Sequence, residues 1–271
     1  MPTFPLSLPA FPAPMSRPDD PTVIAGRNPV REALERGGTD IEKVYVQRGA
    51  HGSAIHDIRQ AAKAAGVPVM DVPPARLNRL APGVTHQGVA AVAAAVAYAE
   101  LGPVLAALAP DPDAVKAQAP LLVALDGVED PHNFGAIVRS AVAAGAAVVI
   151  VPERGSAPLS ATAVKASAGT ALRVPICRVG NLSDTLHGLK ERGYWVYGLA
   201  GESDEPVWEA DWKRAACLVV GSEGQGLSAR VRQTCDAVYA IPMPGDAESL
   251  NASVAAGVAL FAAVRQRAEP S

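Results

Sequence analysis

The 271-residue sequence has few cysteines and few aromatic residues, and it lacks an apolar stretch long and unbroken enough to span a membrane. The cysteines, Cys177, Cys217 and Cys235, are odd in number and have no C-x-x-C spacing, which argues against a disulfide framework or a zinc site. Aromatic residues make up only 4% of the chain, so few are available to stack single-stranded nucleic acid. We therefore expect a metal-free protein of the cytoplasm.

Several motifs of nucleotide and hydrolase sites are also missing. The chain has no G-x-x-x-x-G-K-[ST] loop, no G-x-S-x-G elbow and no H-E-x-x-H helix. The glycines of Gly221–Gly226 are spaced G-x-x-G-x-G, which is not the dinucleotide pattern, and the next strand-like run ends at Met243-Pro244 without an acidic residue. These absences argue against a P-loop NTPase, a nicotinamide enzyme, a serine hydrolase and a zinc protease.

Composition divides the chain into segments. Residues 1–21 contain seven prolines and no periodic pattern, which predicts a disordered tail. Residues 22–98 contain nine Lys/Arg against six Asp/Glu, a net charge of +3, whereas residues 119–271 contain thirteen against sixteen, a net charge of −3. Residues 99–118 are rich in proline and small residues, which favours a linker that includes a short helix. Two modules with different partners fit this division.

Both modules have the alternating pattern of an α/β fold. In the first, KVYVQRG and VPVMDVP resemble strands, with the helical pattern AIHDIRQAAKAAG between them. The second contains six strand-like runs, LLVALDG, AAVVIVP, VPICRV, YWVYGLA, ACLVVG and AVYAIPM. Their nearly continuous apolar character predicts a mainly parallel sheet that is covered on both faces. Ligands bind such sheets at the carboxyl ends of the strands.

Polar loops follow the predicted strands of the second module. VEDPHNFGAIVRS includes Asp130, His132, Asn133 and Arg139, and the other loops are GESDEP, SEGQGLS and PGDAESLN. His132 is more simply explained as a packing or helix-entry residue than as a ligand. Arg139 follows Asn133 by six residues, nearly two helical turns, so we expect both near the helix entry. These residue types suit an anion or an adenosine.

A polar turn, Ser249-Leu250-Asn251, introduces the most apolar helical pattern of the chain. The segment from Val254 to Val264 has no charged residue. A helix cap explains one polar residue, because its side chain accepts hydrogen bonds from the first free amides of the helix. A cap does not explain the whole turn, which predicts a second role.

Three of these loops resemble the motifs of the SpoU family of SPOUT methyltransferases, also called the TrmH family. NFGAIVRSAVAAGA resembles the first motif, LVVGSEGQGLS the second and IPMPGDAESLNASVAAGVALF the third, in the family's order. The residues that match are Asn133, Arg139, Gly221, Glu223, Ile241, Ser249, Leu250 and Asn251. GRNPVREAL and GVTHQGVAA resemble the L30e-like substrate-binding domain of rRNA ribose methyltransferases. The resemblance implies an L30e-like α/β domain followed by a trefoil-knotted α/β domain.

The resemblance also implies an activity: transfer of a methyl group from S-adenosylmethionine to a ribose 2′-hydroxyl of RNA. LDGVEDPHNFGAIVRSA is particularly similar to members that modify a guanosine of large-subunit (23S) rRNA. A homodimer formed through the knotted domain is implied as well. The implied catalytic residues are Arg139, Asn133, Glu223, Ser249 and Asn251. The implied cofactor contacts are Gly221, Ile241, Leu250, Ala200 and Gly201, largely through backbone atoms.

Other readings remain open at this stage. The same chemistry on tRNA would need no additional amino-terminal module. A noncatalytic RNA-binding knot protein would not need Asn133, Arg139, Glu223, Ser249 and Asn251 together. An adenosine-binding metabolic enzyme would have no use for a basic first module.

Overall fold

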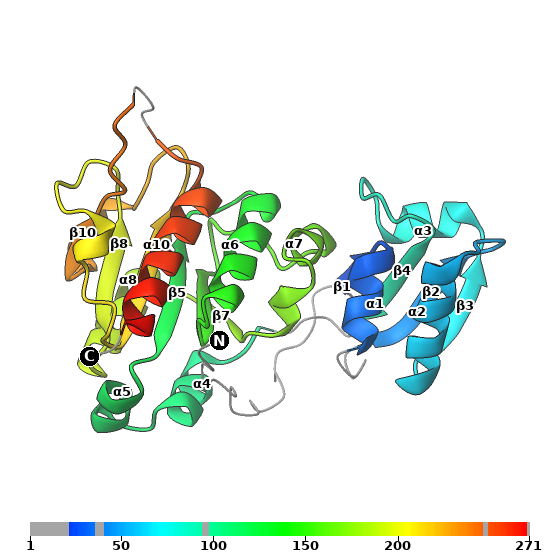
Figure 1. Ribbon diagram of the computed structural model, residues 1–271, viewed down its shortest axis with the longest axis horizontal. Coiled ribbons are helices and arrows are strands. Elements are labelled where there is room, and N and C mark those ends of the chain that lie inside the picture. Colours follow the sequence, from blue (N-terminus) through cyan, green and yellow to red (C-terminus); the bar gives the residue numbers. More distant parts are fainter. Residues whose placement is uncertain (1–21, 36–40, 94–97, 246–248, 270–271) are drawn as a thin grey trace.

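The computed structural model describes residues 22–35, 41–93, 98–245 and 249–269, and the tail predicted to be disordered, residues 1–21, lies outside them. Among the described residues, the amino-terminal domain has a four-stranded sheet with flanking helices (Figure 1). Its elements are β1 (Thr22–Ala25), α1 (Arg27–Glu35), β2 (Ile41–Gln47), α2 (Ser53–Ala64), β3 (Val69–Val72), α3 (Pro74–Leu80) and β4 (Val89–Ala93).

The amino-terminal sheet is mixed, in the order β1-β4-β2-β3. Strand β4 runs antiparallel to β1 and β2, whereas β2 and β3 are parallel because α2 forms the crossover between them. The predicted strand–helix–strand pattern is confirmed here. Helix α3 was not predicted, because its seven residues begin with the second of two consecutive prolines and are too few to show a helical period.

The carboxy-terminal domain contains a six-stranded sheet over its described residues, and each of the six predicted strands is found. All neighbouring strands are parallel, in the order β10-β8-β9-β5-β6-β7. The strands are β5 (Leu121–Asp126), β6 (Val148–Pro152), β7 (Ile176–Val179), β8 (Trp195–Leu199), β9 (Ala216–Gly221) and β10 (Ala237–Tyr239).

Helices cover both faces of this sheet, as the continuous apolar runs predict. In β5, Leu121, Val123 and Leu125 pack on one side, with α6, α7 and α10. Leu122 and Ala124 pack on the other side, with α4, α5, α8 and α9. The helices are α4 (Leu101–Leu108), α5 (Pro112–Gln118), α6 (Pro131–Ala143), α7 (Ala161–Ala166), α8 (Leu182–Glu191), α9 (Ala229–Thr234) and α10 (Ala252–Ala268), with 3-10 turns η1 (Thr170–Leu172) and η2 (Val207–Glu209).

The segment 99–118 contains α4 and α5, whose buried residues Val104, Leu105, Leu108 and Val115 pack on the carboxy-terminal sheet. The division of the chain at this segment stays a prediction. The two domains touch through α7, which packs against β1. The ammonium group of Lys165 on α7 donates a hydrogen bond of 3.2 Å to the carbonyl oxygen of Thr85.

Helix α10 lies beside α6 on the same face of the sheet (Figure 1). Small buried residues, Ala252, Ala256 and Ala259, let it approach the core closely. Its other side exposes Val254 and Phe261, each to about half of its full area. The trefoil knot implied by the resemblance stays a prediction. None of the helices in the described ranges is both long and apolar enough to cross a membrane.

Candidate functional site

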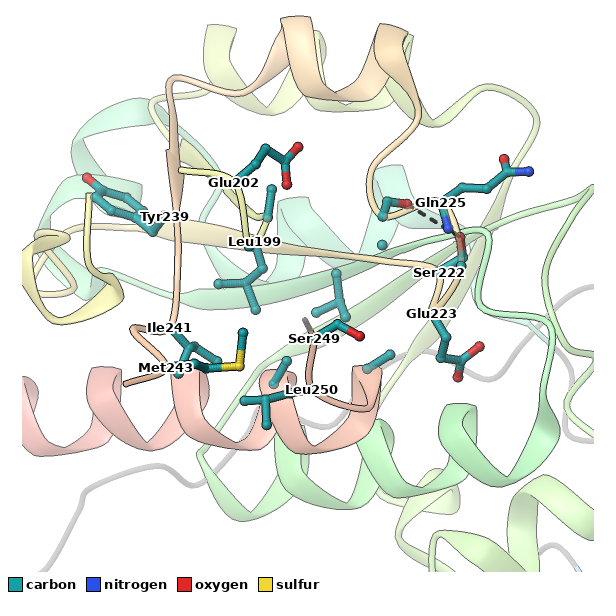
Figure 2. Close-up of a pocket in the computed structure, with 18 residues that line it drawn as sticks. Leu199, Glu202, Ser222, Glu223, Gln225, Tyr239, Ile241, Met243, Ser249 and Leu250 are labelled. Carbon is teal, nitrogen blue, oxygen red and sulfur yellow. Dashed lines mark hydrogen bonds between the residues drawn. The ribbon is translucent and has the colours of Figure 1, made fainter. Parts of the chain in front are cut away.

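A cavity of about 560 Å³ lies at the carboxyl ends of β8, β9 and β10 (Figure 2). These strands are neighbours in the sheet, so the loops that follow them meet although they are far apart in the sequence. The turn before α10 closes the cavity on the side of that helix. This is the edge of a parallel sheet where ligands are expected.

The loop after β9 owes its shape to Gly221. A Cβ at this position would lie 2.2 Å from the carbonyl carbon of Gly226, so only glycine permits the close approach. The loop is closed by two hydrogen bonds of 3.0 Å, from Ser222 N to Gly226 O and from Gly226 N to Ser222 O. Asp126 accepts a further bond of 2.7 Å from the amide of Ser228. The loop that carries Glu223 is therefore held at both ends.

The cavity combines an apolar side with two carboxylates. Ile241, Met243 and Leu250 line it on the side of α10, whereas the exposed carboxylates of Glu202 and Glu223 lie elsewhere on its rim (Figure 2). Of the described residues that line the cavity, none is Lys, Arg or His. A cavity with these properties favours a ligand that has both an apolar ring and a positive charge.

Tyr239 lines the cavity beside its apolar side chains. Burial raises the pKa of the Tyr239 hydroxyl, and the nearby carboxylate of Glu205 adds to this effect. The phenol therefore stays protonated at neutral pH and adds no charge to the wall.

Three side chains from distant parts of the sequence form one hydrogen-bonded chain beside the cavity. Asn251 donates through Nδ2 to Oδ1 of Asn133, at 3.1 Å. Asn133 in turn donates through Nδ2 to the Glu223 carboxylate. Oδ1 of Asn251 accepts from the amides of Ser253 and Val254, at 2.9 and 3.4 Å. Every donor points toward Glu223, so the positive amino-terminal end of α10 polarises the chain toward that carboxylate.

The position of Asn133 is set by the start of α6. Asp130 caps the helix by accepting from the amides of His132 and Asn133, at 3.1 and 3.3 Å, and Pro131 occupies the first turn. Two residues further on, a Cβ at Gly135 would lie 2.5 Å from the carbonyl oxygen of Ala163 in α7. Helix α6 is therefore locked against α7 immediately after the residue that joins the hydrogen-bonded chain.

The remaining predicted catalytic residues are Arg139 and Ser249. Ser249 is exposed and lines the cavity. Arg139 is exposed on α6 and does not line the cavity. Its guanidinium has no hydrogen bond or ion pair with the part of the chain that the structure describes. No hydrogen bond joins Arg139 to Asn133 among the described residues, and the expectation that both serve one region near the helix entry stays a prediction.

Five residues were predicted to contact a cofactor, and all five line this cavity: Gly221, Ile241, Leu250, Ala200 and Gly201. Sequence reasoning missed other lining side chains, Leu199, Glu202, Tyr239 and Met243. Glu202 follows Ala200-Gly201 in a loop that the strand pattern does indicate. The place of Tyr239 in the wall depends on the pairing of β10 with β8, which the sequence does not reveal, and Met243 lies in the segment that follows β10.

The lining residues fit S-adenosylmethionine. The apolar side suits an adenine ring. Of the two rim carboxylates, Glu202 is paired with the guanidinium of Arg232, whereas Glu223 has no ion pair among the described residues and suits a positively charged group. The amides of Ser222 and Gly226 are used within the glycine loop, so the loop offers the amide of Gly224, which no side chain of its own covers. An α/β protein with such a cavity at its sheet edge, and a separate basic domain, belongs to the class of nucleic-acid-directed transferases.

The chain belongs to the SpoU rRNA Methylase family, whose model matches residues 120–261. A second model, described as RNA 2′-O ribose methyltransferase substrate binding, matches residues 23–99. The expected class, an S-adenosylmethionine-dependent RNA 2′-O-ribose methyltransferase, is therefore confirmed.

Relatives resemble the chain over most of its length. The 23S rRNA (guanosine-2′-O-)-methyltransferase RlmB of Xanthomonas campestris is 43% identical over 90% of this chain and 96% of its own. An uncharacterized tRNA/rRNA methyltransferase of Mycobacterium avium is 43% identical over 94% of this chain and 80% of its own. The AdoMet complex of AviRb from Streptomyces viridochromogenes superposes with a TM-score of 0.70, at 26% identity over 90% of both chains.

Proposed function

We propose that this protein methylates the ribose 2′-hydroxyl of a guanosine in 23S rRNA, in the cytoplasm. The relatives named for that reaction support the substrate, since they match 90% of the chain at 43% identity. The observation that carries the proposal is the hydrogen-bonded chain of Asn251, Asn133 and Glu223, which joins all three family motifs beside an acid-lined cavity. A noncatalytic RNA-binding protein has no need of such an arrangement.

The cofactor, S-adenosylmethionine, supplies a methyl group already activated on a sulfonium sulfur, so the main task of the protein is positioning. Gly221, Ile241 and Leu250 would hold the adenosine part, because they form a wall of the cavity. Glu223 fixes Asn133, and Asn133 presents its amide to the ribose that approaches from the RNA. Ser249, exposed at the rim, adds a hydroxyl donor on the side of the third motif.

Arg139 acts on the attacking oxygen. A guanidinium has a pKa above about 12 and stays charged, so its role is to bind a phosphate of the RNA and to favour the alkoxide form of the 2′-oxygen. The exposure of Arg139 and its lack of a carboxylate partner among the described residues leave it available for this role. In the transfer the 2′-oxygen would gain the methyl group, the sulfonium would become a neutral thioether, and the proton of the hydroxyl would pass to solvent.

We also propose that the protein is a homodimer joined through α10. Val254, Val258 and Phe261 follow one another at helical spacing and are 50%, 36% and 51% exposed. A monomer leaves this apolar stripe in water, whereas a second copy of α10 buries it. In this proposal residues 22–98 bind RNA, residues 99–118 join the domains, and residues 119–271 transfer the methyl group.

Mass-spectrometric mapping of ribose methylation on rRNA tests the substrate, in cells with and without the protein. We expect the loss of a single 2′-O-methylguanosine from 23S rRNA. An unchanged rRNA profile together with a lost methyl group on tRNA would refute the proposed target.

The variant Arg139→Ala tests the catalytic assignment. The activation barrier of methyl transfer should rise by about 2–4 kcal/mol, which is the effect of removing one oxyanion donor. The affinity for the cofactor should stay the same. Arg230→Ala is the matched control, because Arg230 is exposed on α9, pairs with Asp184 and belongs to the opposite helix layer. Retained turnover in Arg139→Ala would remove this residue from the mechanism.

A further inference from the structure

A second cavity, of about 950 Å³, lies in the amino-terminal domain. It is formed where the turn after β2, helix α3 and the loop before β4 meet. Polar side chains provide most of its lining, and no Asp or Glu is among the described residues that line it. The polar residues used below are Arg27, Gln47, His51, Asn78, His86 and Gln87.

Arg27 provides the positive charge of this cavity. Its Nε donates to the carbonyl oxygen of Gln87, at 3.1 Å, which fixes the half-buried guanidinium against the loop. No carboxylate of the described residues pairs with it. The two Nη groups therefore remain available, and a guanidinium in this state matches the two oxygens of a phosphate.

The hydrogen-bond directions of His86 are fixed by its neighbours. The amide of Gly88 donates to Nδ1 at 3.0 Å, so Nδ1 has no proton. The proton is then on Nε2, which donates to Oδ1 of Asn78 at 2.9 Å. This bond orients the Asn78 amide and leaves its Nδ2 as a donor. The wall is thus built from neutral groups with defined directions.

His51 completes this set with an acceptor. Its Nδ1 lies 2.9 Å from the carbonyl oxygen of Gly49, and a carbonyl can only accept, so Nδ1 carries the proton. In the neutral form of the ring, which is exposed, Nε2 is then an acceptor. The cavity therefore offers a cation, a fixed donor and a fixed acceptor, which are the groups that read a phosphate and the edge of an unpaired base.

These two cavities differ in the charge of their described lining residues. The cavity at the parallel sheet is lined by the carboxylates of Glu202, which pairs with Arg232 outside the lining, and Glu223, which has no ion pair among the described residues; the lining of the amino-terminal cavity has a guanidinium and no carboxylate. The first suits a cationic cofactor, and the second suits a polyanion. Paired RNA hides its base edges in a groove that side chains cannot read, while unpaired nucleotides expose them.

We propose that this amino-terminal cavity binds unpaired nucleotides of the substrate RNA, with Arg27 on a phosphate and Asn78 and His51 on a base edge. The RNA-cavity proposal rests on the proposed function, because its ligand is the substrate RNA. It adds which residues bind that RNA and that the bound nucleotides are single-stranded. The cavity is also tied to the catalytic domain. Thr85 in its wall accepts from Lys165 of α7, and α7 is locked against α6 at Gly135.

Binding of labelled RNA by the full-length protein tests the proposal. The probe is a hairpin with a loop of about eight unpaired nucleotides, and its companion is the same stem as a closed duplex. Arg27→Gln should weaken hairpin binding about tenfold and reduce the slope of log affinity against log salt by about 0.7, with duplex binding unchanged. Arg76→Gln is the matched control, since Arg76 is exposed on α3 and does not line the cavity.

Asn78→Ala provides a second variant that leaves charge unchanged, in case Arg27→Gln disturbs the turn at Gln87. It should weaken hairpin binding about threefold, the value of one hydrogen bond, with no change in the salt slope. Equal losses in Arg27→Gln and Arg76→Gln would overturn the proposal, because charge alone would then explain them. Equal losses on hairpin and duplex would also overturn it.

Methyl transfer to a 23S rRNA transcript separates this proposal from the proposed function. Arg27→Gln should raise the KM for RNA about tenfold with kcat nearly unchanged, since Arg27 is outside the catalytic domain. A wild-type protein that binds the hairpin but does not methylate the transcript would refute the proposed function alone. An active enzyme whose KM is the same in Arg27→Gln would refute the RNA cavity alone.

Discussion

Replacement of Gly221 by alanine should open the loop that carries Glu223 and weaken cofactor binding. An added Cβ would lie 2.2 Å from the carbonyl carbon of Gly226, 2.4 Å from its oxygen and 2.5 Å from the amide of Leu227. Ordinary contact begins at 3.4 Å, so the two backbone segments must separate by about 1.2 Å. All three atoms belong to the backbone, and no side-chain rotation can relieve the overlap.

The size of the effect follows from what this separation breaks. The two hydrogen bonds between Ser222 and Gly226, each 3.0 Å long, cannot survive a displacement of this size. Their loss and the overpacking together should reduce the free energy of unfolding by about 2–4 kcal/mol. The amides of the opened loop no longer face the cavity, so the affinity for S-adenosylmethionine should fall by about tenfold or more.

Urea unfolding and calorimetric titration with S-adenosylmethionine measure the two effects. Gly224→Ala is the matched control: it adds the same methyl group to the same loop, yet nothing lies within 4 Å of the added atom. Its stability should stay within about 0.5 kcal/mol of the wild type. Gly221→Ala with wild-type stability and affinity would refute the view that the closed loop forms the cofactor wall.

Four further predictions concern α10, the thiol of Cys177 and high pH. Asn251→Asp keeps the cap acceptor but loses the donor to Asn133, so its stability should equal that of the wild type while turnover falls. Asn251→Ala loses both, so it should also lose about 1 kcal/mol of stability. Equal melting temperatures of the Asp and Ala variants would contradict this. Phe261→Lys should convert a dimer to a monomer in light scattering without changing the circular dichroism spectrum. Burial raises the pKa of Cys177 to about 12, so Ellman's reagent at pH 8 should react with it only after denaturation. Burial also raises the pKa of Tyr194 from 10.0 to about 12; the unfolded state then loses that proton first, so stability is complete below pH 10 and falls from there toward pH 12.

The sequence predicts the elements of the carboxy-terminal domain well, because buried parallel strands are read directly as apolar runs. It does not predict their order: β10 and β8 are neighbours, as are β9 and β5, and nothing in either strand identifies its partner. In the amino-terminal domain, the entry of α3 through two prolines hid a helix that carries Asn78. The sequence thus fails to predict features that depend on which strands pair, and helices too short to show a periodic pattern.

The site shows the same division between local and distant information. The cap at Asp130 is readable from the sequence, since Asp-Pro at a helix entry satisfies the first amides. The hydrogen-bonded chain cannot be read from the sequence, because Asn133 is separated from Glu223 by 90 positions and from Asn251 by 118. The resemblance to a family selected these residues, and only the fold reveals which of them touch.

The polar turn before the apolar helix α10 now has a physical explanation. Asn251 uses one atom, Oδ1, to satisfy the free amides of the helix and the other, Nδ2, to hold Asn133. A serine cap would fulfil the first task but lacks the second arm, and a carboxylate cap has no proton to donate. The buried alanines that follow fix the helix against α6 and hence fix the distance that this amide must bridge. The apolar helix therefore positions the polar turn, because its packing fixes the place from which the Asn251 amide joins the start of α10 to Asn133 on α6 and, through Asn133, to Glu223.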